Sequence, residues 1–235
     1  MADDETSSPA SDDPMWAPIA TALRAEMENA PEPGALGAGW QARVTWVRAS
    51  TMDLMNVQRL YFLGFAVAKE EPARISEPTR SWVAQANTLT SANVQMCILA
   101  SGLCSILDSV IREMAEAFVQ ADDVTRVGRK RRLEPDAMKA REQLVRWTSP
   151  TAKAEPTTWC ERLGEVFDLP LSDALTTALV SLVTLRHAYI HERAQVLARR
   201  PIADEATSWC LAVMLVAALL GQRMSERAVL RASSP

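Results

Sequence analysis

The clearest helical stretch of the chain is LCSILDSVIREMAEAF, residues 103–118. Its apolar side chains recur at spacings of three and four and so form one stripe, made of Leu103, Leu107, Val110, Ile111, Met114 and Phe118. Its charged side chains lie off that stripe. This pattern is typical of an amphipathic helix that packs one face on a core. We expect this helix to begin near Ser91.

The same spacing predicts further helices on both sides of this stretch. A first apolar stripe runs from Trp16 to Met27, and the segment PEPGALGAG (31–39) ends it. Ser172 precedes a later helical pattern and is a good N-cap. No segment alternates like a strand, and no glycine-rich phosphate loop is present. We therefore expect an all-α helical bundle of about five to seven helices, including segments 40–69, 157–167 and 204–231 and a short helix near Pro135.

The longest apolar run is WCLAVMLVAALL, residues 209–220. It is shorter than the roughly 20 residues that a membrane-spanning helix needs. Because it is apolar on every side, it predicts a helix buried all round, with no membrane partner.

Composition excludes a chain that is disordered throughout, since 48% of the 235 residues are hydrophobic. The net charge of −4 is uneven, because residues 1–13 (MADDETSSPASDD) carry −5 and the remainder is about +1. The charge therefore neither requires nor opposes a polyanionic partner. We expect a disordered acidic tail over 1–13, an N-terminal helical segment over 14–90, and a helical bundle over 91–235 with a basic insert at 122–156.

The four cysteines form no CxxC pair, and the acidic N-terminus is unlike a secretory signal. We expect reduced thiols in the core of a soluble, cytoplasmic protein.

The segment most informative about chemistry is LVSLVTLRHAYIHER, residues 179–193. At 100° per residue, Arg186 falls in the middle of the apolar face of this helix. A buried guanidinium needs compensation. Either an internal carboxylate pairs with it, or the aliphatic stem is buried while the charged group reaches solvent.

His187 and His191 are the only two histidines of the chain. At a spacing of i, i+4 they share a helix face, as zinc ligands do. No third ligand in this segment completes a tetrahedral site, and the HExxH order is absent. A metal site is therefore disfavoured, and no cofactor is expected. For His187 a solvated polar face is the plainer interpretation.

The motif Arg186-His187-Ala188-Tyr189-Ile190-His191 resembles the R-x4–6-H motif of the HEPN superfamily, whose second position is usually polar. The apolar lead-in LVSLVTL and the all-helical context are similar to that family as well. The resemblance covers residues 175–193 closely and 91–231 only in architecture. It implies a helical domain that dimerises around both copies of the motif, cleaves RNA without a metal, and serves in toxin–antitoxin or antiviral defence systems. Arg186, His191 and His187 are then the catalytic candidates.

The residue types suit RNA cleavage by attack of the 2′-OH. Histidine titrates near neutrality and serves as acid or base, while arginine stays charged and binds phosphate oxygens. Five residues turn a helix through 500°, so Arg186 and His191 lie about 140° apart. Either the helix distorts near His187, or a second subunit completes the site. The RNA-cleaving species is therefore expected to be a homodimer.

One position departs from the family. HEPN toxins that are silenced by nucleotidyltransferase antitoxins carry a tyrosine two places after the motif histidine, where this chain has Arg193. Control through that tyrosine is therefore not expected, although an antitoxin or other regulatory partner protein remains an expectation from the resemblance.

The run RVGRKRR (126–132) is the densest positive charge of the chain. It is either a solvated loop or a surface for RNA phosphates, and its candidate RNA-binding residues are Arg126, Arg129, Lys130, Arg131 and Arg132. Asp108 and Arg112 are candidates for supporting the site or pairing with Arg186. Two alternatives to a nuclease stay open: a HEPN-like fold that acts as a binding or regulatory module, and an unrelated helical-bundle interaction protein.

Overall fold

The computed structural model of the chain describes residues 15–70, 89–151, 154–191 and 203–233, without the side chains of residues 60–70 and 89–92. The expected acidic tail, 1–13, lies outside these residues, as does Arg193. All regular structure in the described residues is helical, which confirms the all-α class. It comprises a 3-10 turn, η1 (Pro33–Ala35), and eight α-helices: α1 (Trp16–Asn29), α2 (Ala38–Glu70), α4 (Leu89–Phe118), α5 (Ala121–Gly128), α6 (Ala137–Trp147), α7 (Pro156–Phe167), α8 (Asp173–His191) and α10 (Ala203–Ala232).

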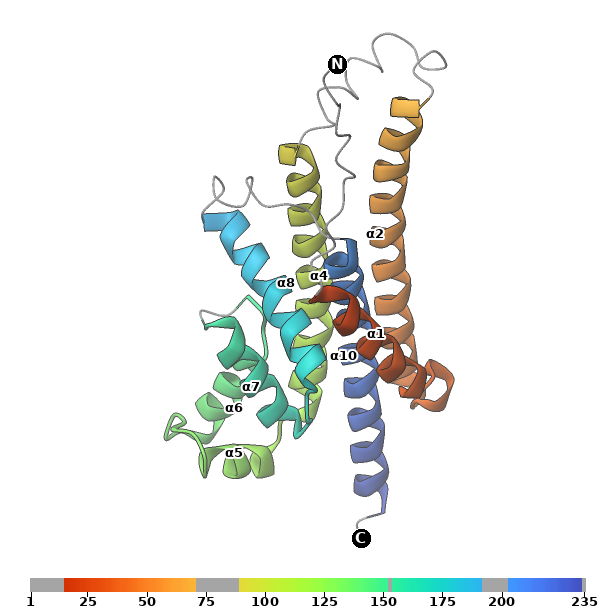
Figure 1. The fold of residues 1–235 in the computed structure, drawn as a ribbon. Coiled ribbons are helices and arrows are strands. Elements are labelled where there is room, and N and C mark those ends of the chain that lie inside the picture. The colour runs from red at the N-terminus through yellow and green to blue at the C-terminus, as the bar shows by residue number, and fades with distance from the viewer. Residues whose placement is uncertain (1–14, 71–88, 152–153, 192–202, 234–235) are drawn as a thin grey trace, which may run out of the picture.

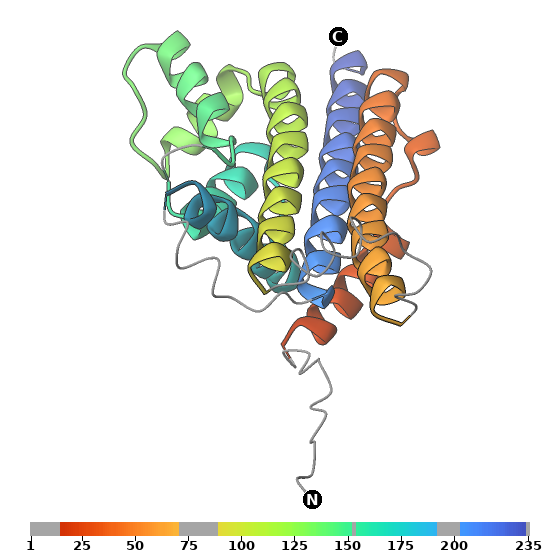
Figure 2. The same ribbon diagram turned by 90° about the horizontal axis from the view of Figure 1, so that it is seen from above.

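Three long helices, α2, α4 and α10, run side by side and form the body of the molecule (Figures 1 and 2). Helix α10 lies between the other two, and α1 crosses over it. Helix α8 packs on α4 and α10, and the short helices α5, α6 and α7 lie on the side away from α2. Helices α1 and α2, from the expected N-terminal helical segment 14–90, pack on α10, and α2 also packs on α4.

Helix α10 is the centre of the core, as its apolar run predicts. Trp209 and every position from Ala212 to Ala218 are buried, and Leu220 is buried as well. At Gly221 the neighbours approach so closely that an added Cβ would lie 2.8 Å from Val44 Cγ2 and 2.9 Å from Leu36 Cδ1. Glycine at this position lets the side chains of Val44 in α2 and of Leu36 after η1 pack close to α10.

Two helical segments, Asn93–Phe118 and Ala203–Ala232, are long and apolar enough by composition to cross a membrane. In their most apolar windows, 56% and 61% of the residues are buried inside the bundle. Core helices of globular proteins meet the same criterion, so packing within the bundle accounts for the apolar character of both.

The insert at 122–156 contains two helices, where the sequence indicated one. Helix α6 begins near Pro135 as expected, with the Asp136 side chain accepting a hydrogen bond from the Lys139 amide at 2.9 Å. Helix α5 was not expected. It opens with a capping box between Gln120 and Asp123, a pairing that satisfies amides of the first turn.

Asp123 also fastens α5 to α10. Its buried carboxylate lies 2.7 Å from Arg227 Nη2 and 3.2 Å from Arg126 Nη2. Burial by itself raises the pKa of Asp123, but hydrogen bonds from Arg227, the Gln120 amide and Arg126 outweigh it, and the pKa is lowered overall. Because both cations approach one buried carboxylate, this contact links the insert to the core.

Candidate functional site

Helix α8 carries the Arg186–His191 motif. The Leu175 amide donates to Ser172 Oγ at 3.1 Å, which confirms Ser172 as the N-cap. The helix then continues without interruption to His191, its last residue. The proposed distortion near His187 is therefore wrong: an unbroken helix keeps Arg186 and His191 on different faces, about 140° apart.

Arg186 is half-buried at the contact between α8 and α4. Its positive charge acts on the Cys104 thiol of α4, and so does the negative charge of Asp108 one turn further along. Among the ion pairs that the described residues form, none includes Arg186. Its half-buried position is compatible with a buried stem and a partly exposed charged group.

The Cys104 thiol beside Arg186 is not a nucleophile at neutral pH. Burial raises its pKa to about 12, and Asp108 adds to the rise, whereas Arg186 opposes it. Because the thiolate is the reactive form, this cysteine stays an inert core residue despite its cationic neighbour.

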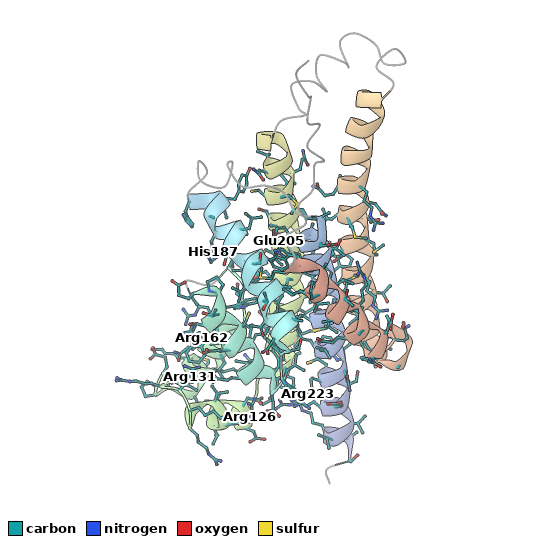
Figure 3. The ribbon with its side chains drawn as sticks, viewed as in Figure 1. Arg126, Arg131, Arg162, His187, Glu205 and Arg223 are labelled. Carbon is teal, nitrogen blue, oxygen red and sulfur yellow. The ribbon has the colours of Figure 1, made fainter. Side chains whose placement is uncertain are left out.

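His187 is half-buried on α8 and faces the start of α7 (Figure 3). Desolvation lowers its pKa below the ordinary value of 6.5, and the positive charges of Arg186 and His191 lower it further. The carboxylate of Glu155, the N-cap residue of α7, acts in the opposite direction but is outweighed. His187 is therefore neutral over a wider pH range than a solvated histidine, and a fully solvated polar face does not describe it.

His191 is exposed at the end of α8. It acts on His187 as a like charge, which indicates that the two imidazoles lie near each other at the i, i+4 spacing. Within the described residues, no three His, Cys, Asp or Glu side chains gather as a metal site would require. The exposed imidazole of His191 is open to a substrate or to a second subunit.

Asp108 and Arg112 pair with each other, with Arg112 Nη2 lying 2.9 Å from Asp108 Oδ2. Ser149, in the turn after α6, donates its hydroxyl to the other Asp108 oxygen and shares a second hydrogen bond with Thr151 Oγ1. Asp108 therefore pairs with Arg112 and Ser149 among the described residues, and its support of the motif stays a prediction.

The basic run divides into two groups. Arg126 donates to the carbonyls of Glu165 and Val166, and Arg131 forms salt bridges with Glu161 and Glu165. These two side chains hold the insert to the last turns of α7. The other three are exposed and free of ion pairs within the described parts of the chain: Arg129, Lys130 and Arg132.

Helix α7 separates this run from the motif. Its first residues face His187, whereas its last turns contact Arg126 and Arg131, which lie toward the other end of the molecule (Figure 3). Glu155 and Glu165 are ten residues apart, or about 15 Å along a helix. The basic run therefore does not line the motif within one subunit.

Sequence reasoning missed Cys104 and Glu155 as neighbours of the motif, and Ser149 as a partner of Asp108. One signal was present: Cys104, Asp108 and Arg112 follow at intervals of four, so they share one face of α4. Ser149 reaches Asp108, and Glu155 reaches the surroundings of His187, only through the tertiary packing of α6 and α7. Local sequence patterns do not predict such packing.

Comparison of the chain with known protein families, with curated proteins and with solved structures finds no match. The functional argument therefore rests on the residues themselves.

Proposed function

We propose that this protein is a metal-independent endoribonuclease of the HEPN type, acting in a toxin or phage-defence system. One observation carries the proposal. A single unbroken helix presents a half-buried, permanently charged arginine on one face and an exposed histidine on another, in the spacing of the R-x4–6-H motif.

Each residue type has a task in cleavage by the 2′-OH. His191 exchanges protons with the attacking hydroxyl or the leaving oxygen, since an imidazole serves as acid or base. Arg186 stabilises the charge that develops on the phosphate. His187, kept neutral by its lowered pKa, supports the site as a hydrogen-bonding group. The RNA supplies its own nucleophile, so no serine or thiolate is needed.

A second subunit completes the arrangement. Because Arg186 and His191 diverge by about 140° on an unbroken helix, one copy of α8 does not direct both at the same phosphate. Two copies related by a two-fold axis place the histidine of one beside the arginine of the other, and they supply an acid and a base from one residue type.

The test is incubation of the purified protein with a panel of RNAs and their DNA counterparts in EDTA, followed by end-group analysis. We expect RNA cleavage with 2′,3′-cyclic phosphate or 3′-phosphate ends and 5′-hydroxyls, and intact DNA. The His191→Ala protein is the control for contaminating nucleases. Cleavage that requires Mg²⁺ and leaves 5′-phosphates would indicate another enzyme class. RNA binding without cleavage would favour a non-catalytic module.

A further inference from the structure

A groove of about 760 Å³ lies between α4 and α6, outside the motif. Three arginines line it, one from α4 and two from α6: Arg112, Arg141 and Arg146. The hydroxyl residues Ser149 and Thr151 line it as well. Guanidinium and hydroxyl groups are the donors that phosphate oxygens accept from.

Arg112 is held in position by Asp108, one turn earlier on α4. Its Nη2 atom lies 2.9 Å from Asp108 Oδ2, and Asp108 in turn accepts a hydrogen bond from Ser149. More than half of the Arg112 side chain, 58%, is exposed in spite of this salt bridge. One edge of its guanidinium is therefore fixed while the rest remains open to a ligand.

The two arginines of α6 differ in their freedom. Arg141 donates to the carbonyls of Val119 and Glu116 at the end of α4, so it joins the two helices that form the groove. Arg146 is exposed, and no carboxylate of the described residues lies within salt-bridge distance of it. Arg146 is thus the cation in the groove that is most available to bind an anion.

Two carboxylates, Glu116 and Glu142, also line the groove. With three arginines, the lining has a formal charge of +1. Such a surface attracts a phosphodiester without the strong, undirected field of a polybasic patch. Removing an arginine charge should weaken the binding of an anion to the groove. Removing the Glu142 charge should strengthen it, because Glu142 is exposed and repels the anion.

The groove and the motif both border α4. Cys104, Asp108, Arg112 and Glu116 follow at intervals of four residues, with Arg186 acting on the first and the groove beginning at the third. Eight residues of helix span about 12 Å. The part of α4 next to Arg186 and the part that lines the groove are therefore about two helical turns apart.

We propose that the α4–α6 groove binds the phosphodiester backbone of the RNA strand next to the bond that is cut, through Arg112 and Arg146. This inference rests on the proposed function and adds where the RNA strand binds. Arg112 and Arg146 position the strand, and they do not touch the reacting atoms.

The test measures binding apart from cleavage, using the full chain and a fluorescent 2′-O-methyl oligoribonucleotide, which lacks the attacking hydroxyl. We expect Arg112→Gln with Arg146→Gln to weaken binding by about tenfold or more, as the removal of charge-assisted hydrogen bonds does. The slope of log K against log salt should fall by about 0.7 for each phosphate that the double variant no longer neutralises. Glu142→Gln should tighten binding. Arg231→Gln, in the last turn of α10 and outside the lining of the groove, is the matched control and should change neither quantity.

Several outcomes would overturn the inference. Binding and salt slope that are unchanged in the double variant would exclude the groove, and so would a Glu142→Gln protein that binds more weakly. A mononucleotide that binds as tightly as the oligomer would assign the groove to a free nucleotide instead of RNA. The proposed function is tested separately: unmodified RNA that stays intact while the groove variants lose affinity would refute cleavage but support the groove.

Discussion

Arg186 and His191 occupy different environments on one helix, and their substitution should have different consequences. Arg186 has its stem packed where α4 meets α8, and its charge also reaches the buried Cys104 thiol there. His191 is exposed at the helix end, where its side chain contributes little to packing. A loss of activity can therefore be distinguished from a loss of stability more easily for His191 than for Arg186.

We predict that His191→Ala abolishes RNA cleavage with little change in melting temperature. Arg186→Ala should also abolish cleavage but lower stability, by about 1 kcal/mol, because its stem no longer packs between the helices. His187→Ala should weaken cleavage less than either. Single-turnover cleavage assays and thermal denaturation measure the two effects. A fully active His191→Ala protein would remove the basis of the nuclease proposal.

His187 makes the stability of the fold depend on pH. Its pKa in the folded protein is below the ordinary value of 6.5, so the unfolded chain binds the proton more tightly. The stabilisation by neutral His187 is present above pH 6.5 and is lost as pH falls through the lowered pKa.

We predict that the melting temperature of the wild-type protein falls between pH 7.5 and 5.5, and that His187→Gln reduces this fall. Glutamine keeps a polar side chain but does not titrate. The neighbours that act on His187 are unchanged by this substitution: Arg186, His191 and Glu155. Equal pH dependence in both proteins would show that His187 is solvated.

Among the helices, the long ones were predictable and the shortest was not. The bounds of α2, α4 and α10 follow from apolar spacing, because each has many core positions. Helix α5 has eight residues and only two buried side chains, Asp123 and Val127, so periodicity did not mark it. Its signal was the capping pair Gln120 and Asp123, three residues apart. The burial of Asp123 depends on Arg227, 104 residues later, and was beyond sequence reasoning.

We predict that Gly221→Ala destabilises the protein by about 1 kcal/mol. The new methyl group meets Val44 and Leu36, and overpacking of this kind costs about 1–3 kcal/mol, partly offset by the better helix propensity of alanine. Gly39→Ala in α2 is the control, since no atom would lie within 4 Å of its Cβ. Chemical denaturation distinguishes them, and two equally stable variants would mean that the packing around Gly221 relaxes freely.

Substitutions in the basic run should have two kinds of effect, according to whether the side chain is exposed or contacts the rest of the fold. We predict that neutralising Arg129, Lys130 and Arg132 together weakens RNA binding and flattens its salt dependence without lowering the melting temperature. Arg126→Ala should instead destabilise the fold by about 1–3 kcal/mol, because two carbonyls and the Asp123 carboxylate lose a donor. An unchanged salt slope in the triple variant would identify the exposed residues as a solvated loop.

For the chain as a whole, the class of fold was predictable and the surroundings of the motif were not. Apolar spacing indicated the all-α bundle, and the R-x4-H spacing indicated Arg186 and His191. The Asp108–Ser149 contact joins residues 41 apart in sequence, and the groove arises where α4 and α6 meet. Local sequence patterns do not predict tertiary contacts of this kind.

We predict that the active species is a homodimer whose cleft contains both copies of the motif. Sedimentation of the purified protein should give about twice the chain mass of 25.8 kDa. Co-expression of an Arg186→Ala chain with a His191→Ala chain should restore a small part of the activity, because a mixed dimer places one intact arginine beside one intact histidine but lacks the second histidine of the acid–base pair. A monomer at micromolar concentration that still cleaves RNA would contradict this prediction.

The four buried cysteines can report local unfolding of the helices that carry them. Cys97 and Cys104 lie in α4, Cys160 in α7 and Cys210 in α10, and burial raises the pKa of the last three to about 12. An alkylating reagent therefore reacts only when the helix that carries the thiol separates from its neighbours. Mass spectrometry of timed labelling would show whether α7 detaches before α4 and α10, without any engineered probe.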